Sequence, residues 1–376
     1  MDIPSFSTSS SEAFRHWRRF VLTAFSALLL LPLLCYSFVL AMDPYDNLSF
    51  SPGFDRVPVD KLQRLFHPAL ARKTDFDSAV IGSSNVRLLR PDLLNQQLGG
   101  NFVNLGMNAA SSWEQQQIFN VFVRSHRQIN TVIFGMDYLW CKARFADQKF
   151  VGANTAAGFP AWMYDERSDN NLPPLNLGTL KHAWLQMLTA TGIHASKYGR
   201  DGYTVFTKPM SEYKLDRARK EIYGSVKPQK KKPARTPVQM TAEQRAQLPM
   251  PAMLRLEEML TSLPPEARKI ILFVPYHNFY QARRGSKESI IWQECKQRVV
   301  KLASSMEKAY VVDFMIRSPI TTRDRNYWDY KHYTVEVAET LPALLARASK
   351  DTSKHPKYRR LHPSRPANGL EPNGTE

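Results

Sequence analysis

The chain has 376 residues, of which 43% are hydrophobic, so it is long enough to bury one substantial core. Its net charge of +17 is concentrated, because residues 208–235 hold ten basic and three acidic side chains and residues 350–376 hold six and three. Both segments are rich in proline and polar residues, which indicates solvated loop and tail. They could alternatively contact anionic lipid or an anionic polymer. The charge pattern therefore does not indicate the folded basic face of a nucleic-acid-binding domain.

Residues 20–42 contain no charged side chain. As a helix this segment is about 34 Å long, enough to cross a hydrocarbon core of about 30 Å. Arginines precede it and Asp43 and Asp46 follow it, so the positive-inside rule predicts a cytoplasmic tail over residues 1–19 and export of the remainder. A cleaved signal peptide is the alternative, but its apolar core is normally shorter. We predict an uncleaved transmembrane anchor and, because the basic segments are exported, no nucleic-acid partner.

The cysteines form no metal or disulfide pattern. Cys35 lies in the predicted anchor, which leaves Cys141 and Cys295 in the exported part. Two cysteines are no disulfide framework and lack the spacing of zinc ligands. One bridge between them is possible in an oxidising compartment, but we expect buried or unreactive thiols. We expect neither a metal nor a cofactor.

The exported chain alternates short apolar runs with helical patterns. After an irregular stalk over residues 43–74, apolar runs predict strands at residues 77–82, 101–105, 131–135, 269–275 and 309–313. Helical patterns follow at residues 89–97, from residue 111, and at residues 253–263, 287–305 and 335–349. Continuous apolar strands alternating with helices predict an α/β domain over residues 75–348, with a five-stranded parallel sheet covered on both faces.

Two regions depart from this alternation. Residues 141–250 carry aromatic and polar loops, a helix near residues 180–188 and the basic linker, which we interpret as an insertion or lid over the carboxyl edge of the sheet. Residues 349–376 are rich in proline, lysine and arginine, which predicts a disordered basic tail.

The first predicted strand ends in Gly82-Ser83-Ser84. This order places a hydroxyl at the carboxyl end of a strand, beside the unpaired N–H groups of a following helix that can hold an anionic intermediate. Such a serine is a candidate nucleophile. The same pattern also occurs at an ordinary strand-to-helix turn with a serine cap.

A candidate base stands far along the chain, in the loop before the last helix. Asp329 and His332 form an Asp-x-x-His pair there. A nucleophilic serine needs a base, and a histidine base needs an acceptor that fixes its tautomer. Both this loop and the one after the first strand belong to the carboxyl edge of a doubly wound sheet, so the sequence predicts that they meet.

Together these motifs resemble the SGNH (GDSL-type) family of ester hydrolases and acyltransferases, over residues 76–140 and 269–348. The resemblance implies a flavodoxin-like three-layer sandwich, with Ser84 as nucleophile, His332 as base and Asp329 orienting the base. The segment around Asn108 and Ala109 resembles the block that supplies a backbone oxyanion donor, with Ala109 at the position of the family's glycine.

Asp137 departs from the family pattern, because it falls where the family offers an asparagine to the oxyanion. An ionised carboxylate cannot donate that hydrogen bond, and loss of one donor costs about 2.7–4 kcal/mol. Three interpretations remain open: a protonated Asp137, a donor supplied elsewhere such as Asn108, or a weakened or inactive site.

Within the family, the chain is most similar to single-span proteins of the bacterial cell envelope, of the alginate-acetylation and teichoic-acid D-alanylation types. This similarity implies a bacterial inner-membrane protein with a periplasmic domain, a glycan or glycolipid substrate, and a multi-pass membrane acyltransferase as partner. His277 lies in a segment that also resembles such proteins, as an acceptor-binding or a structural residue. We therefore expect a membrane-anchored serine esterase or O-acyltransferase working through an acyl-enzyme; the alternative is a weak or inactive scaffold that binds polymer.

Overall fold

A computed structural model describes residues 9–59, 62–143, 158–165, 171–351 and 353–362. It divides into two compact units, one made of residues 1–59 and 167–196 and the other of residues 60–166 and 197–376. The predicted cytoplasmic tail lies outside the described residues up to residue 8, as does the chain beyond residue 362.

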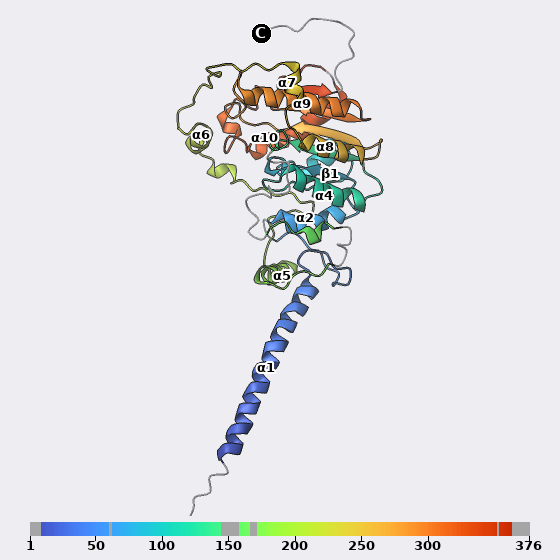
Figure 1. Cartoon of the computed structure of the whole chain (residues 1–376), viewed down its shortest axis with the longest axis vertical. Coiled ribbons are helices and arrows are strands. Elements are labelled where there is room, and N and C mark those ends of the chain that lie inside the picture. Colours follow the sequence, from blue (N-terminus) through green and yellow to red (C-terminus); the bar gives the residue numbers. More distant parts are fainter. Residues whose placement is uncertain (1–8, 60–61, 144–157, 166–170, 352, 363–376) are drawn as a thin grey trace, which may run out of the picture. The chain divides into compact units, whose positions relative to one another are not determined.

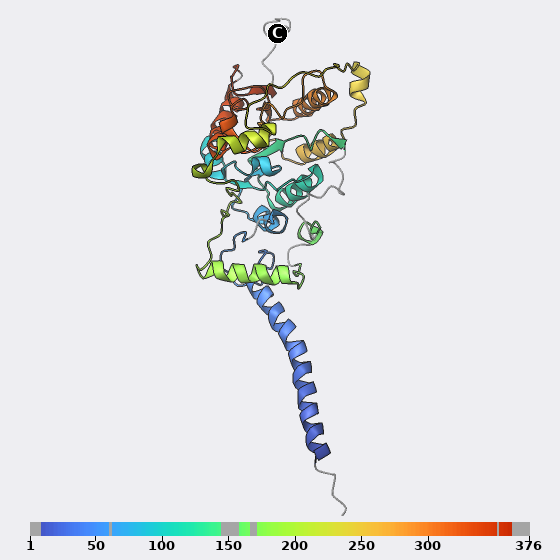
Figure 2. The ribbon, with the colours of Figure 1, turned by 90° about the vertical axis from the view of Figure 1, so that its left-hand side faces the viewer.

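The first unit is built on a long N-terminal helix, α1 (Ser9–Met42). Its part Glu12–Met42 is long and apolar enough to cross a membrane. At its C-terminal end Arg56 Nε donates to the carbonyl oxygen of Met42 at 3.0 Å, which satisfies one of the last helical acceptors. The unit also contains α5 (Leu177–Ala190), which the sequence predicts as residues 180–188 of a lid. Within this unit α5 packs against α1 (Figure 2).

The second unit is a mixed α/β domain around a six-stranded sheet of order β2-β1-β3-β4-β5-β6 (Figure 1). Its strands are β1 (Ser78–Ile81), β2 (Phe102–Asn104), β3 (Thr131–Met136), β4 (Arg268–Phe273), β5 (Ala309–Asp313) and β6 (Arg359–His362). The first five pair in parallel, and β6 pairs with β5 antiparallel. The prediction of a five-stranded sheet is therefore wrong by one edge strand.

That sixth strand comes from the segment predicted to be a disordered tail. Tyr358, directly before β6, is buried against Phe314, with ring centroids 5.6 Å apart. One aromatic anchor thus holds a basic segment on the sheet edge, where charged side chains also discourage pairing with other chains.

Helices cover both faces of the sheet (Figure 2). On one face, α4 (Ser112–Ser125) packs on β1, α8 (Ala252–Thr261) beside it, and α9 (Lys287–Ser304) on β5. On the other, α3 (Pro91–Leu98) packs on β2 and α10 (Val335–Lys350) on β5. A capping box begins α4, because Ser111 Oγ accepts from Glu114 N and Glu114 Oε2 accepts from Ser111 N.

The remaining helices lie outside the regular alternation. They are α2 (Gln63–Arg72), α6 (Leu215–Tyr223) and α7 (Ala242–Ala246), with 3₁₀ turns η1 (Ser84–Val86), η3 (Ala161–Met163), η4 (Met210–Glu212) and η5 (Asp324–Asn326). The sequence predicts an irregular stalk over residues 43–74, but within it α2 is a buried helix that packs on α4. Buried Arg64 reaches Glu114 of α4, with Nε 2.5 Å from Oε1. A helix is predicted from apolar residues that recur on its buried face. Because charged and polar residues occupy part of the buried face of α2, the sequence gives little indication of this helix.

Cys141, shortly after β3, forms a disulfide with Cys295 of α9, with Cα atoms 5.6 Å apart. The expectation of two unreactive thiols is therefore wrong. Cys35 of α1 is a free thiol. The bridge joins positions 154 residues apart, and closure of a long loop restricts the unfolded chain.

Candidate active site

Ser84 lies at the carboxyl end of β1, in the first residue of η1, and is half-buried. The turn is fixed by Val86, whose side chain lies against three glycines. A Cβ atom added at Gly82, Gly106 or Gly135 would clash with the Val86 methyl groups. Glycine is therefore required where β1 and β3 end and after β2, because only its backbone leaves room for the side chain that holds the turn.

Ser84 and the predicted Asp-x-x-His pair meet at this edge of the sheet. Ser84 Oγ lies 2.9 Å from His332 Nε2, and His332 Nδ1 lies 2.6 Å from Asp329 Oδ2. The carboxylate can only accept, so Nδ1 carries the proton and Nε2 is left to accept from the serine hydroxyl. Positions 84 and 332 of the sequence are thus in the contact that a serine nucleophile and its base require.

Asp329 is held ionised and in place by its own loop. Its Oδ1 accepts from the N–H groups of Lys331 and His332, both at 2.8 Å. Burial opposes ionisation, but the hydrogen bond and the charge of His332, with these two N–H groups, outweigh it and lower the pKa of Asp329. The carboxylate is therefore a fixed acceptor for the imidazole.

Two tyrosines bind the His332 loop to the rest of the domain. The hydroxyl of Tyr333 donates to the carbonyl oxygen of Asn85, the residue after Ser84. Tyr327 OH donates to the carbonyl oxygen of Pro275 after β4 at 2.9 Å. Both tyrosines are buried, and Tyr333 ties the loop of His332 directly to the turn that carries Ser84.

Backbone donors lie in the serine turn and in the segment after β2, and the two are joined by a hydrogen bond from Met107 N to the carbonyl oxygen of Gly82 at 3.0 Å. Ala109 is one of the few described non-glycine residues with positive φ, at 49°, and is exposed. Within the described chain, the N–H groups of Ser84 and Ala109 have no hydrogen-bond acceptor. Free N–H groups beside a nucleophile suit the oxygen anion of a tetrahedral intermediate.

Asn108 is oriented by a buried arginine. Its Oδ1 accepts from Arg87 Nη1 at 2.6 Å, which leaves the side-chain Nδ2 as a donor. The Arg87 guanidinium also stacks over the ring of Phe206, 4.7 Å from the centroid, and that ring lies edge-on to His332 at 5.5 Å. Residue 206 belongs to the predicted insertion, so part of that insertion contacts the histidine.

Asp137 is aimed at Ser83. Its Oδ2 accepts from Ser83 Oγ at 2.5 Å and its Oδ1 from Leu139 N at 2.9 Å. Burial raises the pKa of Asp137, although the hydrogen bonds from Ser83 and Leu139 act in the opposite direction. Asn85 joins the same cluster, with Nδ2 3.2 Å from both Ser83 Oγ and Tyr276 OH. Both carboxyl oxygens are therefore occupied, which favours donors other than Asp137 for an oxyanion.

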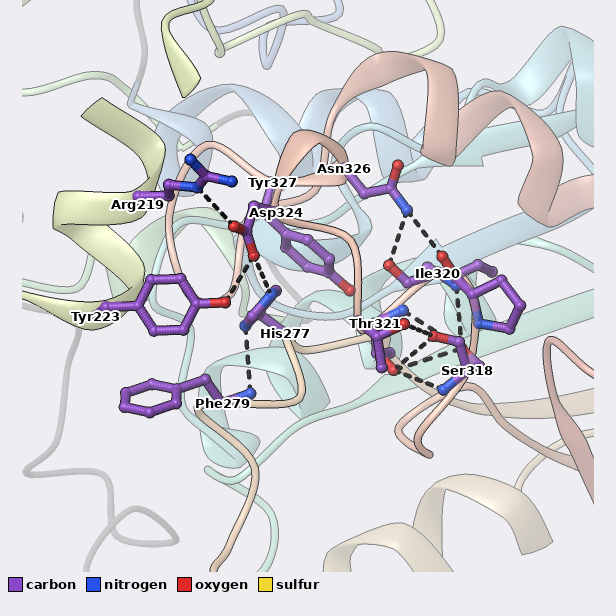
Figure 3. Close-up of polar contacts among 12 residues, drawn as sticks. Arg219, Tyr223, His277, Phe279, Ser318, Ile320, Thr321, Asp324, Asn326 and Tyr327 are labelled. Carbon is purple, nitrogen blue, oxygen red and sulfur yellow. Dashed lines mark hydrogen bonds and ion pairs between the residues drawn. The ribbon is translucent and has the colours of Figure 1, made fainter. Parts of the chain in front are cut away.

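His277 lies in a separate buried cluster (Figure 3). Its Nδ1 accepts from Phe279 N at 3.2 Å, and its Nε2 lies 3.3 Å from Asp324 Oδ1. Burial lowers the pKa of His277 despite the nearby carboxylate. Its backbone N–H donates to the carbonyl oxygen of Tyr330, next to Asp329. Both ring nitrogens face protein groups, so the structural interpretation of His277 agrees with the geometry.

Asp324 is the centre of that cluster (Figure 3). Tyr223 OH donates to Oδ1 at 2.6 Å and Arg219 Nε donates to Oδ2 at 2.8 Å, both from α6. Tyr213 OH lies 3.0 Å from the Asp324 carbonyl oxygen and 3.1 Å from that of Tyr327. Burial opposes ionisation, but the hydrogen bonds from Tyr223 and Arg219 to its carboxylate lower the pKa of Asp324. Sequence reasoning missed this connection between the insertion and the Asp329–His332 loop, because partners about 100 residues apart leave no local spacing.

Among the described residues, no group of three or more His, Cys, Asp or Glu side chains is arranged to hold a metal ion.

No protein-family model matches the chain, and no curated protein matches it in sequence. Among solved structures, the chain is similar to one described as "The structure of a putative platelet activating factor from Streptococcus pneumonia", at 11% sequence identity and a TM-score of 0.37. The alignment covers 77% of this chain and 90% of that chain. Similarity at this level assigns no family, so the geometry around Ser84 has to carry the functional argument.

Proposed function

We propose that the protein is a membrane-anchored serine esterase or O-acyltransferase of the SGNH type. The hydrogen-bonded row Ser84–His332–Asp329 carries this proposal. The parallel strand order β2-β1-β3-β4-β5 supports it, since that order is typical of flavodoxin-like doubly wound sheets, which bind ligands at the carboxyl edge beside β1 and β3.

In this mechanism His332 Nε2 removes the proton of Ser84 Oγ as the oxygen attacks an ester carbonyl. The N–H groups of Ser84 and Ala109 bind the oxyanion, with Asn108 as a further donor. His332 then protonates the leaving alcohol, which leaves an acyl group on Ser84. In the second half, His332 deprotonates water or a sugar hydroxyl, which attacks the acyl-enzyme and releases Ser84.

The location proposed for this chemistry is the extracytoplasmic side of a bacterial inner membrane, with residues 1–19 in the cytoplasm, residues 20–42 as anchor and an SGNH-like domain over residues 75–348. The apolar helix α1 supports a single-pass anchor. The Cys141–Cys295 disulfide supports an oxidising compartment. We propose an envelope glycan or glycolipid as substrate and a multi-pass acyltransferase as the source of acyl groups.

The experiment is labelling with a serine-reactive fluorophosphonate, alongside hydrolysis of a small acetyl ester, for the full chain in detergent. Ser84→Ala should abolish both signals. The matched control is Ser83→Ala, which removes the neighbouring hydroxyl and should retain labelling. Undiminished labelling of Ser84→Ala would refute the assignment.

A second candidate function is a non-catalytic polymer-binding scaffold for a membrane acyltransferase. Asp137 favours it, because the carboxylate withdraws one expected oxyanion donor. A basic cavity of about 610 Å³ also favours it, lined among others by Lys230, Lys232, Arg235 and Arg283, with aromatic Tyr280. If Ser84→Ala still complements a deletion strain and the purified protein turns over no ester, the scaffold function holds and the enzymatic one fails.

A further inference from the structure

Helix α5 buries its polar side. The residues that face the protein in the first unit are Thr179, His182, Ala183 and Gln186. Tyr45 OH lies 3.0 Å from His182 Nδ1. Gln186 Nε2 donates to the carbonyl oxygens of Pro44 at 3.2 Å and Val57 at 2.8 Å. Hydrogen bonds therefore fix α5 to the segment that follows α1.

The opposite side of α5 carries apolar residues into the open. Leu177 is 86% exposed and Trp184 is 53% exposed, and their spacing of seven residues places them on one stripe. The segments flanking the helix add exposed Leu172, Leu175 and Ile193. A helix in water shows the reverse arrangement, with its apolar face buried and its polar face solvated. An exposed apolar face of this kind marks a surface that contacts something other than water.

The neighbour of this face is α1. An open groove of about 550 Å³ lies between the two helices, lined by Leu34, Cys35 and Phe38 of α1 and Leu177, Leu180, Lys181 and Trp184 of α5. Phe38 and Leu34 lie four and eight residues before the end of α1 at Met42, about 6 and 12 Å along the helix axis. Figure 2 shows α5 lying across this end of α1. The groove therefore lies at the depth of the last turns of the apolar helix.

We propose that α5 is an interfacial helix, which lies in the surface of the bilayer where α1 leaves it and whose groove against α1 is filled by lipid acyl chains. Interfacial helices are buried about 5–10 Å into the boundary between headgroups and acyl chains, which matches the position of the groove on α1. Trp184 also suits that boundary, since tryptophan is enriched at membrane–water interfaces.

Lipid is the occupant that the groove favours because half of its wall is α1 itself. The α1 residues next to this wall, such as Leu31 and Leu33, are exposed, and they belong to residues 20–42, which contain no charged side chain. A surface continuous with a membrane span is covered by the same solvent as the span. This inference rests on α1 as a span and is independent of the chemistry at Ser84.

The test uses the full chain reconstituted in phosphatidylcholine vesicles that carry nitroxide-labelled lipids, with the label either near the headgroup or near the chain end. The emission of a single tryptophan is obtained by subtracting the spectrum of its Phe variant from the spectrum of the wild type. Trp184→Phe reports on α5, and Trp17→Phe in α1 verifies that the anchor is inserted. Trp292→Phe is the negative control, because that side chain is buried in the core of the second unit.

We expect the Trp184 emission to be lost in the presence of nitroxide lipids, more with the label near the headgroup, while the Trp292 emission persists. If Trp184→Phe does not fold, Leu177→Trp in an otherwise wild-type background gives an added signal with the same expectation. Unquenched Trp184 with quenched Trp17 would overturn the inference, including the case in which a second copy of the chain covers α5. Unquenched Trp17 would show that α1 does not insert into the bilayer, which would overturn the inference as well.

Discussion

The protein contains two histidine–aspartate pairs that differ in what surrounds them. His332 and Asp329 lie three residues apart in one partly exposed loop, and the second ring nitrogen of His332 faces a hydroxyl. His277 is buried, its partner Asp324 is 47 residues away, and its other ring nitrogen accepts a backbone N–H. A base needs a nitrogen that can reach a substrate or nucleophile. Both histidines are paired with aspartate, so the pairing does not distinguish them. His332 is the catalytic candidate because its second ring nitrogen faces the hydroxyl of Ser84 and not a backbone N–H.

The largest expected effect comes from replacing each histidine by glutamine. His332→Gln removes the base and should lower kcat for ester hydrolysis by at least about 10⁴-fold. His277→Gln should lower kcat by less than about tenfold, but it should lower the unfolding free energy by about 1–3 kcal/mol, because it disturbs a buried hydrogen-bonded group. Steady-state kinetics and urea unfolding of both variants measure the contrast. Equal losses of activity would break the distinction between the two pairs.

The two aspartates should show the same contrast, with loss of activity at Asp329 and loss of stability at Asp324. Asp329→Asn no longer enforces the His332 tautomer with a proton on Nδ1, so kcat should fall by about 10³–10⁴-fold while the fold persists. Asp324→Asn removes the ionised acceptor of Arg219 and Tyr223, so it should mainly lower stability, by about 1–3 kcal/mol. A smaller activity loss in Asp329→Asn than in Asp324→Asn would contradict this account.

Arg219→Gln is the matched control for Asp324, because it removes the charge on the other side of the same ion pair. We expect it to reproduce part of the stability loss of Asp324→Asn. Its effect on kcat should stay within about tenfold, since Arg219 acts on the Asp329–His332 loop only through Asp324.

The smallest expected effect is a change in pH dependence. The pKa of His277 is lowered from 6.5 by burial, so the folded protein holds this histidine neutral. The resulting stability is present above pH 6.5 and is lost as the pH falls toward the folded pKa, because the unfolded chain then binds a proton that the folded chain does not. His277→Gln should therefore show a shallower loss of unfolding free energy below pH 6.5 than the wild type.

Buried His67 provides an internal reference for that measurement. Burial lowers its pKa to about 3, so it contributes a loss of stability in the same direction in both proteins. The difference between the two pH curves therefore isolates His277. Superimposable slopes would show that the folded and unfolded chains bind a proton at His277 equally, which contradicts a lowered pKa of His277.

The sequence was informative where local order determines the chemistry. The apolar run before Gly82 predicts β1 and its turn, and the three-residue spacing of Asp329 and His332 predicts their hydrogen bond, because neither depends on distant partners. The meeting of Ser84 with His332 followed from the rule that parallel strands bring their carboxyl ends to one edge.

The features that sequence reasoning missed depend on long-range partners. The composition of residues 208–235 predicts a solvated loop, yet Arg219 and Tyr223 of this segment both donate hydrogen bonds to Asp324. The sequence predicts a helix at residues 180–188, but it does not show that the buried side of α5 is polar and contacts the segment after α1. A helical period gives the two faces of such a helix, but it does not say which face is buried.

Activation of Ser84 by His332 can be tested by mass-spectrometric mapping of the fluorophosphonate adduct. We expect an adduct on Ser84 and none on Ser83. The Ser84 adduct should be lost in His332→Gln and retained in His277→Gln. An adduct on Ser83, or one on Ser84 that His332→Gln leaves at the wild-type rate, would contradict this account.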